Sequence, residues 1–126
     1  MPADKRHRDV VTIIDETVLL RYLLNDDAAK SARARSLILG GNVRVYPETI
    51  VRTVCVLTEV YGVPRSLVGN VVELLLGDVS VEDEASVRLA ARLFGSGKLD
   101  FDACLASARS TLYGYQTCSF ARPARR

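Results

Sequence analysis

The pattern of apolar and polar positions begins with a short apolar run and then takes helical spacing. Residues 10–14, Val-Val-Thr-Ile-Ile, are mostly β-branched, which is typical of a short strand buried on both faces. Over residues 18–23 the apolar side chains recur at i, i+1, i+4 and i+5, the spacing of an amphipathic helix. The pattern therefore predicts a buried strand that passes directly into a helix, with Asp15 at the junction.

The rest of the chain alternates short apolar runs with longer helical patterns. Further strands are predicted at about residues 43–46, 79–81 and 117–120. Helices are predicted at about residues 16–24, 28–39, 47–61, 65–76, 84–94 and 101–113. Strands that alternate with helices in this way predict an α/β protein, a three-layer α/β/α sandwich with a central parallel sheet.

Length and composition indicate one ordinary globular domain. The chain has 126 residues, 48% apolar and 25% charged, with a net charge of only +2. Basic residues concentrate at 1–9 and 121–126, which we expect to be flexible basic tails of the single domain 1–126. No apolar run approaches membrane-spanning length. Three cysteines without CxxC spacing and the lack of a signal peptide predict buried, reduced thiols in a cytoplasmic protein.

The candidate chemistry rests on acids, because the single His7 and the absence of a phosphate-binding glycine loop exclude the common alternatives. Acids that stand at the starts of predicted elements are Asp15, Glu16, Glu48, Asp83, Asp100 and Asp102. Carboxylates that converge at one end of a parallel sheet repel each other and need a cation, for which Mg²⁺ or Mn²⁺ is suited. Such a site activates water for phosphodiester cleavage.

A purely structural interpretation competes with the metal site. Asp15 can cap the following helix through the amide of Thr17 or Val18. Asp83 and Glu84 are assigned this helix-start role outright, because acids there are favoured by the helix dipole.

Three blocks of the chain resemble PIN-domain proteins, and most closely the VapC-like ribonuclease toxins of type II toxin–antitoxin pairs. They are Ile-Asp-Glu-Thr-Val-Leu-Leu-Arg-Tyr-Leu-Leu-Asn-Asp-Asp at 14–27, Tyr-Pro-Glu-Thr at 46–49 followed by Val-Tyr-Gly-Val-Pro-Arg at 60–65, and Leu-Asp-Phe-Asp-Ala-Cys-Leu-Ala at 99–106. The resemblance spans about residues 11–120. It implies an α/β/α sandwich, a magnesium-dependent endoribonuclease activity on RNA, a cognate antitoxin and a homodimer.

Two of the four acids of the family have counterparts here. Asp15 matches the first acid and Asp102 the third, which the resemblance makes the catalytic and metal-binding residues. Thr17 takes a supporting position beside the metal. Because the third block is one residue shorter than usual, Asp100 competes with Asp102.

The other two acids are missing. Arg52 or Thr53 falls at the second acidic position, and Ala121 falls at the fourth. Arg52 is expected either to act as a built-in counter-ion between the carboxylates or to pair with Glu48 at i−4.

Two functions follow from the resemblance. The first is a VapC-like, magnesium-dependent endoribonuclease. The alternative is a degenerate, catalytically weak or inactive PIN domain that binds antitoxin or RNA. Apolar faces within the helices at 16–24 and 65–76 exceed what a small sheet needs to cover, which predicts a homodimer with an antitoxin groove between the early helices.

Overall fold

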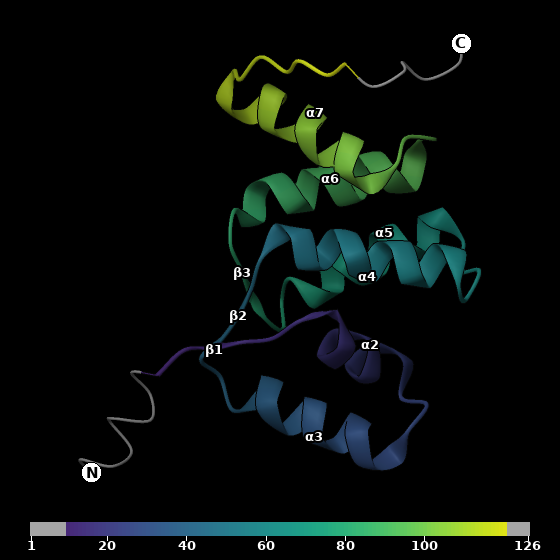
Figure 1. The fold of residues 1–126 in the computed structure, drawn as a ribbon, viewed down its shortest axis with the longest axis vertical. Helices are drawn as coiled ribbons and strands as arrows, with labels where there is room; N and C mark the ends of the chain where they lie inside the picture. Colours follow the sequence, from purple (N-terminus) through teal and green to yellow (C-terminus); the bar gives the residue numbers. More distant parts are fainter. Residues whose placement is uncertain (1–9, 121–126) are drawn as a thin grey trace.

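The computed structural model describes residues 10–120, so the two predicted tails and Ala121 lie outside the described residues (Figure 1). The elements in chain order are β1 (Thr12–Ile13), α2 (Glu16–Leu24), α3 (Ala28–Leu39), β2 (Val43–Val45), α4 (Pro47–Glu59), α5 (Arg65–Leu75), β3 (Ser80–Val81), α6 (Glu84–Ser96) and α7 (Phe101–Tyr113). The predicted α/β class is confirmed, and the predicted helices are all present.

The three strands form one small parallel sheet in the order β1-β2-β3. Thr12 lies opposite Val43, and Val45 lies opposite Val81. The parallel direction is confirmed, and it follows from the helices that connect each strand to the next. All three strands therefore end at the same edge of the sheet, where Asp15, Tyr46 and Asp83 follow them.

The strand predicted at residues 117–120 is wrong, because the structure has no strand there. Residues 111–120 are all exposed, and Phe120 is 99% exposed. Gly114 ends α7 in the left-handed conformation at φ 70°, and the chain then runs back over α7, away from the sheet (Figure 1). No strand among residues 10–120 lies beside this segment, so its apolar side chains stay exposed.

The helices form two groups that α4 connects. In Figure 1, α2 and α3 lie at the bottom, the strands lie at the left, and α4 to α7 are stacked toward the top. Helix α2 packs on α3, α5 packs on α6, and α6 packs on α7, while α4 contacts α2, α5 and α7. Helices that are close in sequence therefore lie in the same group, and α4 contacts helices of both groups.

The core contains most of the side chains that were expected to form an excess apolar surface. Leu19, Val68, Val72 and Leu75 are at most 2% exposed, and the remaining leucines of α2 are half-buried against the same core. The predicted excess on these two helices is therefore wrong, because α2 buries its apolar face in the core with α3 and α4, and α5 buries its face with α4 and α6. The homodimer itself stays a prediction.

Close contact between α5 and α6 depends on Gly69. A Cβ at this position would lie 2.7 Å from the backbone oxygen of Ala91 and 3.3 Å from the Cα of Gly95. Both atoms belong to the backbone of α6, so a rotamer change cannot relieve the clash. The two helices must move apart to accept any side chain here.

We expect Gly69→Ala to lower the free energy of unfolding by about 1–3 kcal/mol, because overpacking outweighs the gain in helix propensity. Urea denaturation followed by circular dichroism measures this change. The neighbouring and exposed Asn70→Ala is the matched control and should stay within about 0.5 kcal/mol of the wild type. Equal stability of Gly69→Ala and the wild type would contradict the close packing.

Candidate functional site

Asp15 begins α2 at the carboxyl end of β1, where the backbone leaves the sheet. Its neighbours Ile14 and Leu19 are buried at 4% and 0% exposure, which fixes the junction. Asp15 Oδ1 accepts hydrogen bonds from the backbone N–H of Thr17 at 3.0 Å and from the Thr17 hydroxyl. The capping interpretation of Asp15 is therefore confirmed, and Thr17 is its partner.

The surroundings of Asp15 keep its carboxyl group ionised. The hydrogen bond from the Thr17 hydroxyl lowers the pKa of Asp15 most, and burial works in the opposite direction. Amide hydrogen bonds from Thr17 and Val18 and the charge of Arg52 lower the pKa further. Asp15 is thus an exposed anion at neutral pH.

Arg52 projects from α4 toward the first turn of α2. Its Nε donates to Oε1 of Glu16 at 2.9 Å, and its Nη2 donates to the hydroxyl of Thr49 at 3.3 Å. The hydrogen bond from Arg52 is also the main cause that lowers the pKa of Glu16. The guanidinium therefore pairs with Glu16 and is near enough to Asp15 for a charge interaction; both carboxylates follow β1.

The expected pairing of Arg52 with Glu48 is replaced by the bond to Glu16, 36 positions away in sequence. Glu48 contributes only a charge interaction that raises the pKa of Arg52. Thr53, the other candidate for the second acidic position, is 1% exposed and its hydroxyl donates to the backbone oxygen of Thr49. Thr53 belongs to the core, so Arg52 is the residue that faces the carboxylates.

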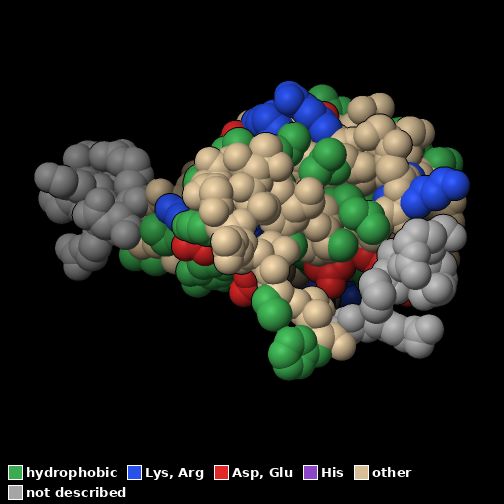
Figure 2. Space-filling view, turned by 90° about the horizontal axis from the view of Figure 1, so that it is seen from above, with side chains coloured by type: hydrophobic (Ala, Val, Ile, Leu, Met, Phe, Trp, Pro, Cys, Tyr) green, Lys and Arg blue, Asp and Glu red, His purple; other side chains and the backbone are tan. Residues whose placement is uncertain are grey.

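Asp102 and Asp100 lie at the start of α7, beside a hollow of about 250 Å³. The hollow is lined by α4, the starts of α5 and α7, and Phe94 of α6, and its polar lining includes Cys55 and Glu59. Asp102 Oδ1 accepts the amide of Ala103 at 2.8 Å. The face shown in Figure 2 has a hollow in which acidic side chains gather.

The structure thus places Asp15 and Asp102 in different surroundings. Asp15 shares hydrogen bonds or charge interactions with Thr17, Glu16 and Arg52, whereas the hollow beside Asp102 is not lined by Asp15. Among residues 10–120, no three His, Cys, Asp or Glu side chains are grouped so that they could hold one metal ion. The shared Asp15–Asp102 magnesium site stays a prediction.

A second hollow, of about 420 Å³, lies between α2 and α3. Its lining combines the cations Arg21, Lys30 and Arg33 with apolar side chains, and it reaches Thr17 at the Asp15 junction. Arg21 also pairs with Asp26 at 2.9 Å. The hollow lies between the two early helices and has a basic rim. The antitoxin groove predicted between the early helices stays a prediction.

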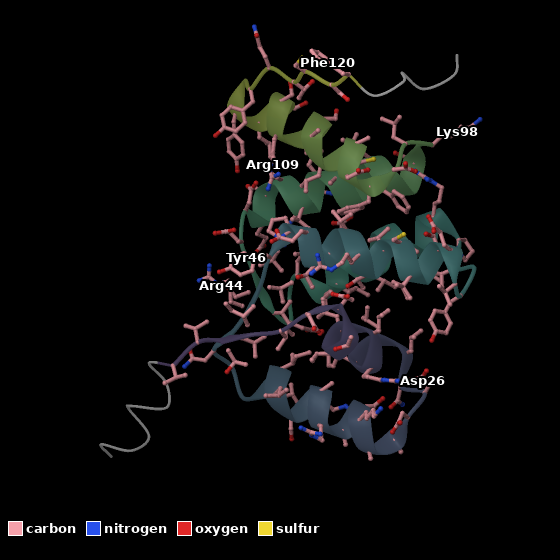
Figure 3. All side chains as sticks on the ribbon, viewed as in Figure 1. Asp26, Arg44, Tyr46, Lys98, Arg109 and Phe120 are labelled. Atoms are coloured by element: carbon pink, nitrogen blue, oxygen red, sulfur yellow. The ribbon has the colours of Figure 1, made fainter. Side chains whose placement is uncertain are left out.

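Sequence reasoning missed the role of Asp83, which follows β3. Asp83 has φ 56° and makes no side-chain cap to the helix backbone. Its carboxylate accepts hydrogen bonds from Arg109 Nε at 2.8 Å, Ser86 Oγ at 2.9 Å and the hydroxyl of Tyr113. Arg109 lies on the same side of the molecule as Tyr46, which follows β2 (Figure 3). Because Arg109 and Tyr113 come from α7, 26 and 30 positions away, the spacing around Asp83 gave no signal for them.

All three cysteines are free thiols, as predicted, but the predicted burial was right for only one of them. Cys104 is buried, whereas Cys55 and Cys118 are exposed. The hydrogen bond with Glu59, then burial and nearby acidic charges, raise the pKa of Cys55. Cys55 is therefore a protonated thiol at neutral pH rather than a thiolate ligand.

Comparison of the chain with models of protein families, with curated proteins and with solved structures gave no match. Within the described residues, no helix has the length and apolar character needed to cross a membrane.

We expect Asp83→Asn to lower the free energy of unfolding by about 1–3 kcal/mol at neutral pH, because three donors lose a charged acceptor. Burial raises the pKa of Asp83, but the bonds from Tyr113, Arg109 and Ser86 outweigh it and leave the pKa below 3.8. A depressed pKa in the folded state stabilises the fold above 3.8, and this stabilisation disappears as pH falls through the folded-state value.

The difference in free energy of unfolding between the wild type and Asp83→Asn should therefore be constant near neutral pH and shrink in acid. Urea denaturation at a series of pH values measures it. Glu84→Gln, which changes the adjacent and more exposed acid, serves as the control and should cost less than about 0.5 kcal/mol. A difference that grows in acid would contradict the assigned direction of the pKa.

Proposed function

We propose that this chain is a PIN-like α/β/α domain of the VapC type that binds RNA and is weak or inactive in magnesium-dependent cleavage. The observation that carries the proposal is the guanidinium of Arg52, which pairs with Glu16 and interacts through its charge with Asp15. The resemblance of the three sequence blocks to PIN-domain proteins supports the PIN-like fold and the RNA binding in this proposal. The geometry supports the degenerate alternative over the active ribonuclease.

Arg52 supplies the positive charge that these carboxylates need. A guanidinium is permanently charged and offers five donors in a planar fork. It relieves repulsion between Asp15 and Glu16 without a metal, and it also repels an approaching divalent cation. Asp15 Oδ1 already accepts two hydrogen bonds from Thr17, so less of its carboxylate is available as a ligand.

The hollow between α2 and α3 supplies the RNA-binding chemistry of the proposal. Helix α3 contains Lys30, Arg33 and Arg35 and no acidic residue. Cations around a hollow attract phosphate oxygens. Thr17 lines the hollow and donates a hydrogen bond to Asp15. An RNA strand bound in the hollow would therefore pass close to the carboxylate of Asp15. An acidic antitoxin peptide would meet the same cations and is the competing partner in the test.

The ionised state of Asp15 favours a second candidate, the magnesium-dependent endoribonuclease. In that case Asp15 and Asp102 would hold the metal, which would supply an activated water and neutralise charge on the phosphate. Their separate surroundings in the structure weigh against this reading. Magnesium binding distinguishes the two candidates directly.

We expect Lys30→Glu to weaken binding of a structured RNA by about three- to tenfold and to reduce the salt dependence of binding, because one phosphate contact is lost. Lys30 follows the capping Asp27 at the start of α3, where an acid is compatible with the helix. Fluorescence anisotropy with a labelled RNA measures the affinity at several salt concentrations.

Lys98→Glu carries the same charge change and is the matched control, because Lys98 lies at the far end of the molecule from α3 (Figure 3). Equal losses in the two variants would show that only net charge matters and would reject the groove. Absence of RNA binding by the wild type would reject the proposed function, and binding of an acidic peptide in its place would point to the antitoxin role.

We expect the wild type to bind magnesium no more tightly than the millimolar range and Arg52→Glu to lower the dissociation constant about tenfold or more, because a cation near Asp15 is replaced by a ligand. Isothermal titration calorimetry measures both. Arg52→Gln is the control that removes the charge without adding a carboxylate. Micromolar magnesium binding by the wild type, with RNA cleavage, would favour the ribonuclease and reject the counter-ion role.

A further inference from the structure

Strand β1 lies at an end of the sheet order, and its side chains are unusually apolar for an exposed edge. Val10, Val11 and Ile13 are 58%, 54% and 59% exposed. No charged residue or proline occurs from position 10 to 14, although edge strands are usually protected by charges, prolines or bulges. The sequence predicted these residues to be buried on both faces, so their exposure is a departure that needs an explanation.

The backbone of β1 has an open side. The N–H of Thr12 donates to the carbonyl of Asn42 at 2.8 Å, and the N–H of Ile14 donates to the carbonyl of Arg44 at 3.2 Å. Because alternate residues of a strand hydrogen-bond to the same side, the N–H and C=O groups of Val11 and Ile13 point away from β2. These groups form a template on which another strand can pair.

We propose that β1 pairs antiparallel with β1 of a second copy of this chain, about a two-fold axis that passes beside Thr12. In this register Val11 of each copy lies opposite Ile13 of the other, and their outward N–H and C=O groups bond reciprocally. The two three-stranded sheets then form one continuous sheet. The interface differs from the helical faces that the sequence suggested and does not depend on the proposed function.

The edge favours a second copy because its pairing chemistry is self-complementary. A two-fold axis places the same patch on both sides of an interface, and a patch without charge from 10 to 14 can face itself without burying like charges. The antiparallel contact matches β-branched side chains with β-branched side chains across the strands, which stabilises a sheet. A charged partner strand would find no opposite charge on these residues.

The protein's own uncharged segment at 115–120 is the competing occupant. In the structure it lies over α7, at the other end of the molecule from β1 (Figure 1). Gly114 sets its direction, and the ring of Tyr115 lies 5.3 Å from that of Tyr113. The observed position of this segment therefore leaves β1 open to a second copy.

Sedimentation velocity over a range of concentrations tests the dimer. We expect the wild type to dimerise at micromolar concentration and Ile13→Lys to raise the dissociation constant about tenfold or more, because a charge would enter the paired edge. Leu74→Lys is the matched control, since Leu74 is 74% exposed on α5, and it should leave dimerisation unchanged. A monomeric wild type at high micromolar concentration, or equal effects of both variants, would overturn the proposal.

Disulfide trapping tests the register and the occupant. The two copies of residue 12 form a non-hydrogen-bonded pair with Cα atoms about 4.5 Å apart, which a disulfide can bridge. In a Cys55→Ser background, Thr12→Cys should give a covalent dimer under mild oxidation, whereas Ser80→Cys on the opposite edge strand should not. A monomer with a disulfide from position 12 to Cys118 would show that the protein's own segment covers the edge, and would overturn the proposal.

Discussion

The packing of α4 against α2 on one side and α7 on the other is the constraint on which the arrangement of charges depends. Buried side chains such as Ile50 and Val54 hold the helix, so its rotation about its own axis is fixed. Arg52 consequently faces Glu16 of α2, whereas Cys55 and Glu59 line the hollow beside Asp102. One helix therefore separates Asp15 and Glu16 from Asp100 and Asp102, and the two groups have different electrostatic surroundings.

These two groups differ in how their negative charge is balanced. Near β1, Arg52 and the donors of Thr17 neutralise or solvate the carboxylates. Around the hollow beside Asp102, Arg65 is the cation in the lining, but it is directed elsewhere. Its Nε donates to the backbone carbonyl of Phe94 at 3.1 Å, and its guanidinium carbon lies 3.8 Å from the centre of the Phe94 ring. Charge balance, rather than the number of acids, distinguishes the two ends of α4.

Local signals in the sequence were enough for the helices. The bounds of α3 and α7 are those predicted, because Asp27 caps the first helix and Gly114 ends the second. Asp15, which follows β1, was also identified from the sequence, together with Thr17 as a possible partner in the helix cap.

Contacts between distant segments could not be predicted from the same signals. The bond from Arg52 to Glu16 and the bonds from α7 to Asp83 depend on how the helices pack. The segment at 117–120 shows the limit most clearly, because an apolar run indicates that a strand can form but not whether a neighbouring strand is available. The sequence therefore identified some residues of the candidate site, but it could not predict which of them contact one another.

The position of Asp83 has a consequence for how the molecule opens. Its carboxylate joins the first turn of α6 to the last turn of α7, and the neighbouring N–H of Glu82 donates to the carbonyl of Val45 at 2.9 Å. The end of α7 is thus connected through two residues to the middle strand of the sheet. Fraying of the last turn of α7 breaks the bonds to Asp83, next to the backbone bond that holds Glu82 at β2. We therefore expect the backbone amides of the two regions to exchange with solvent as one cooperative unit.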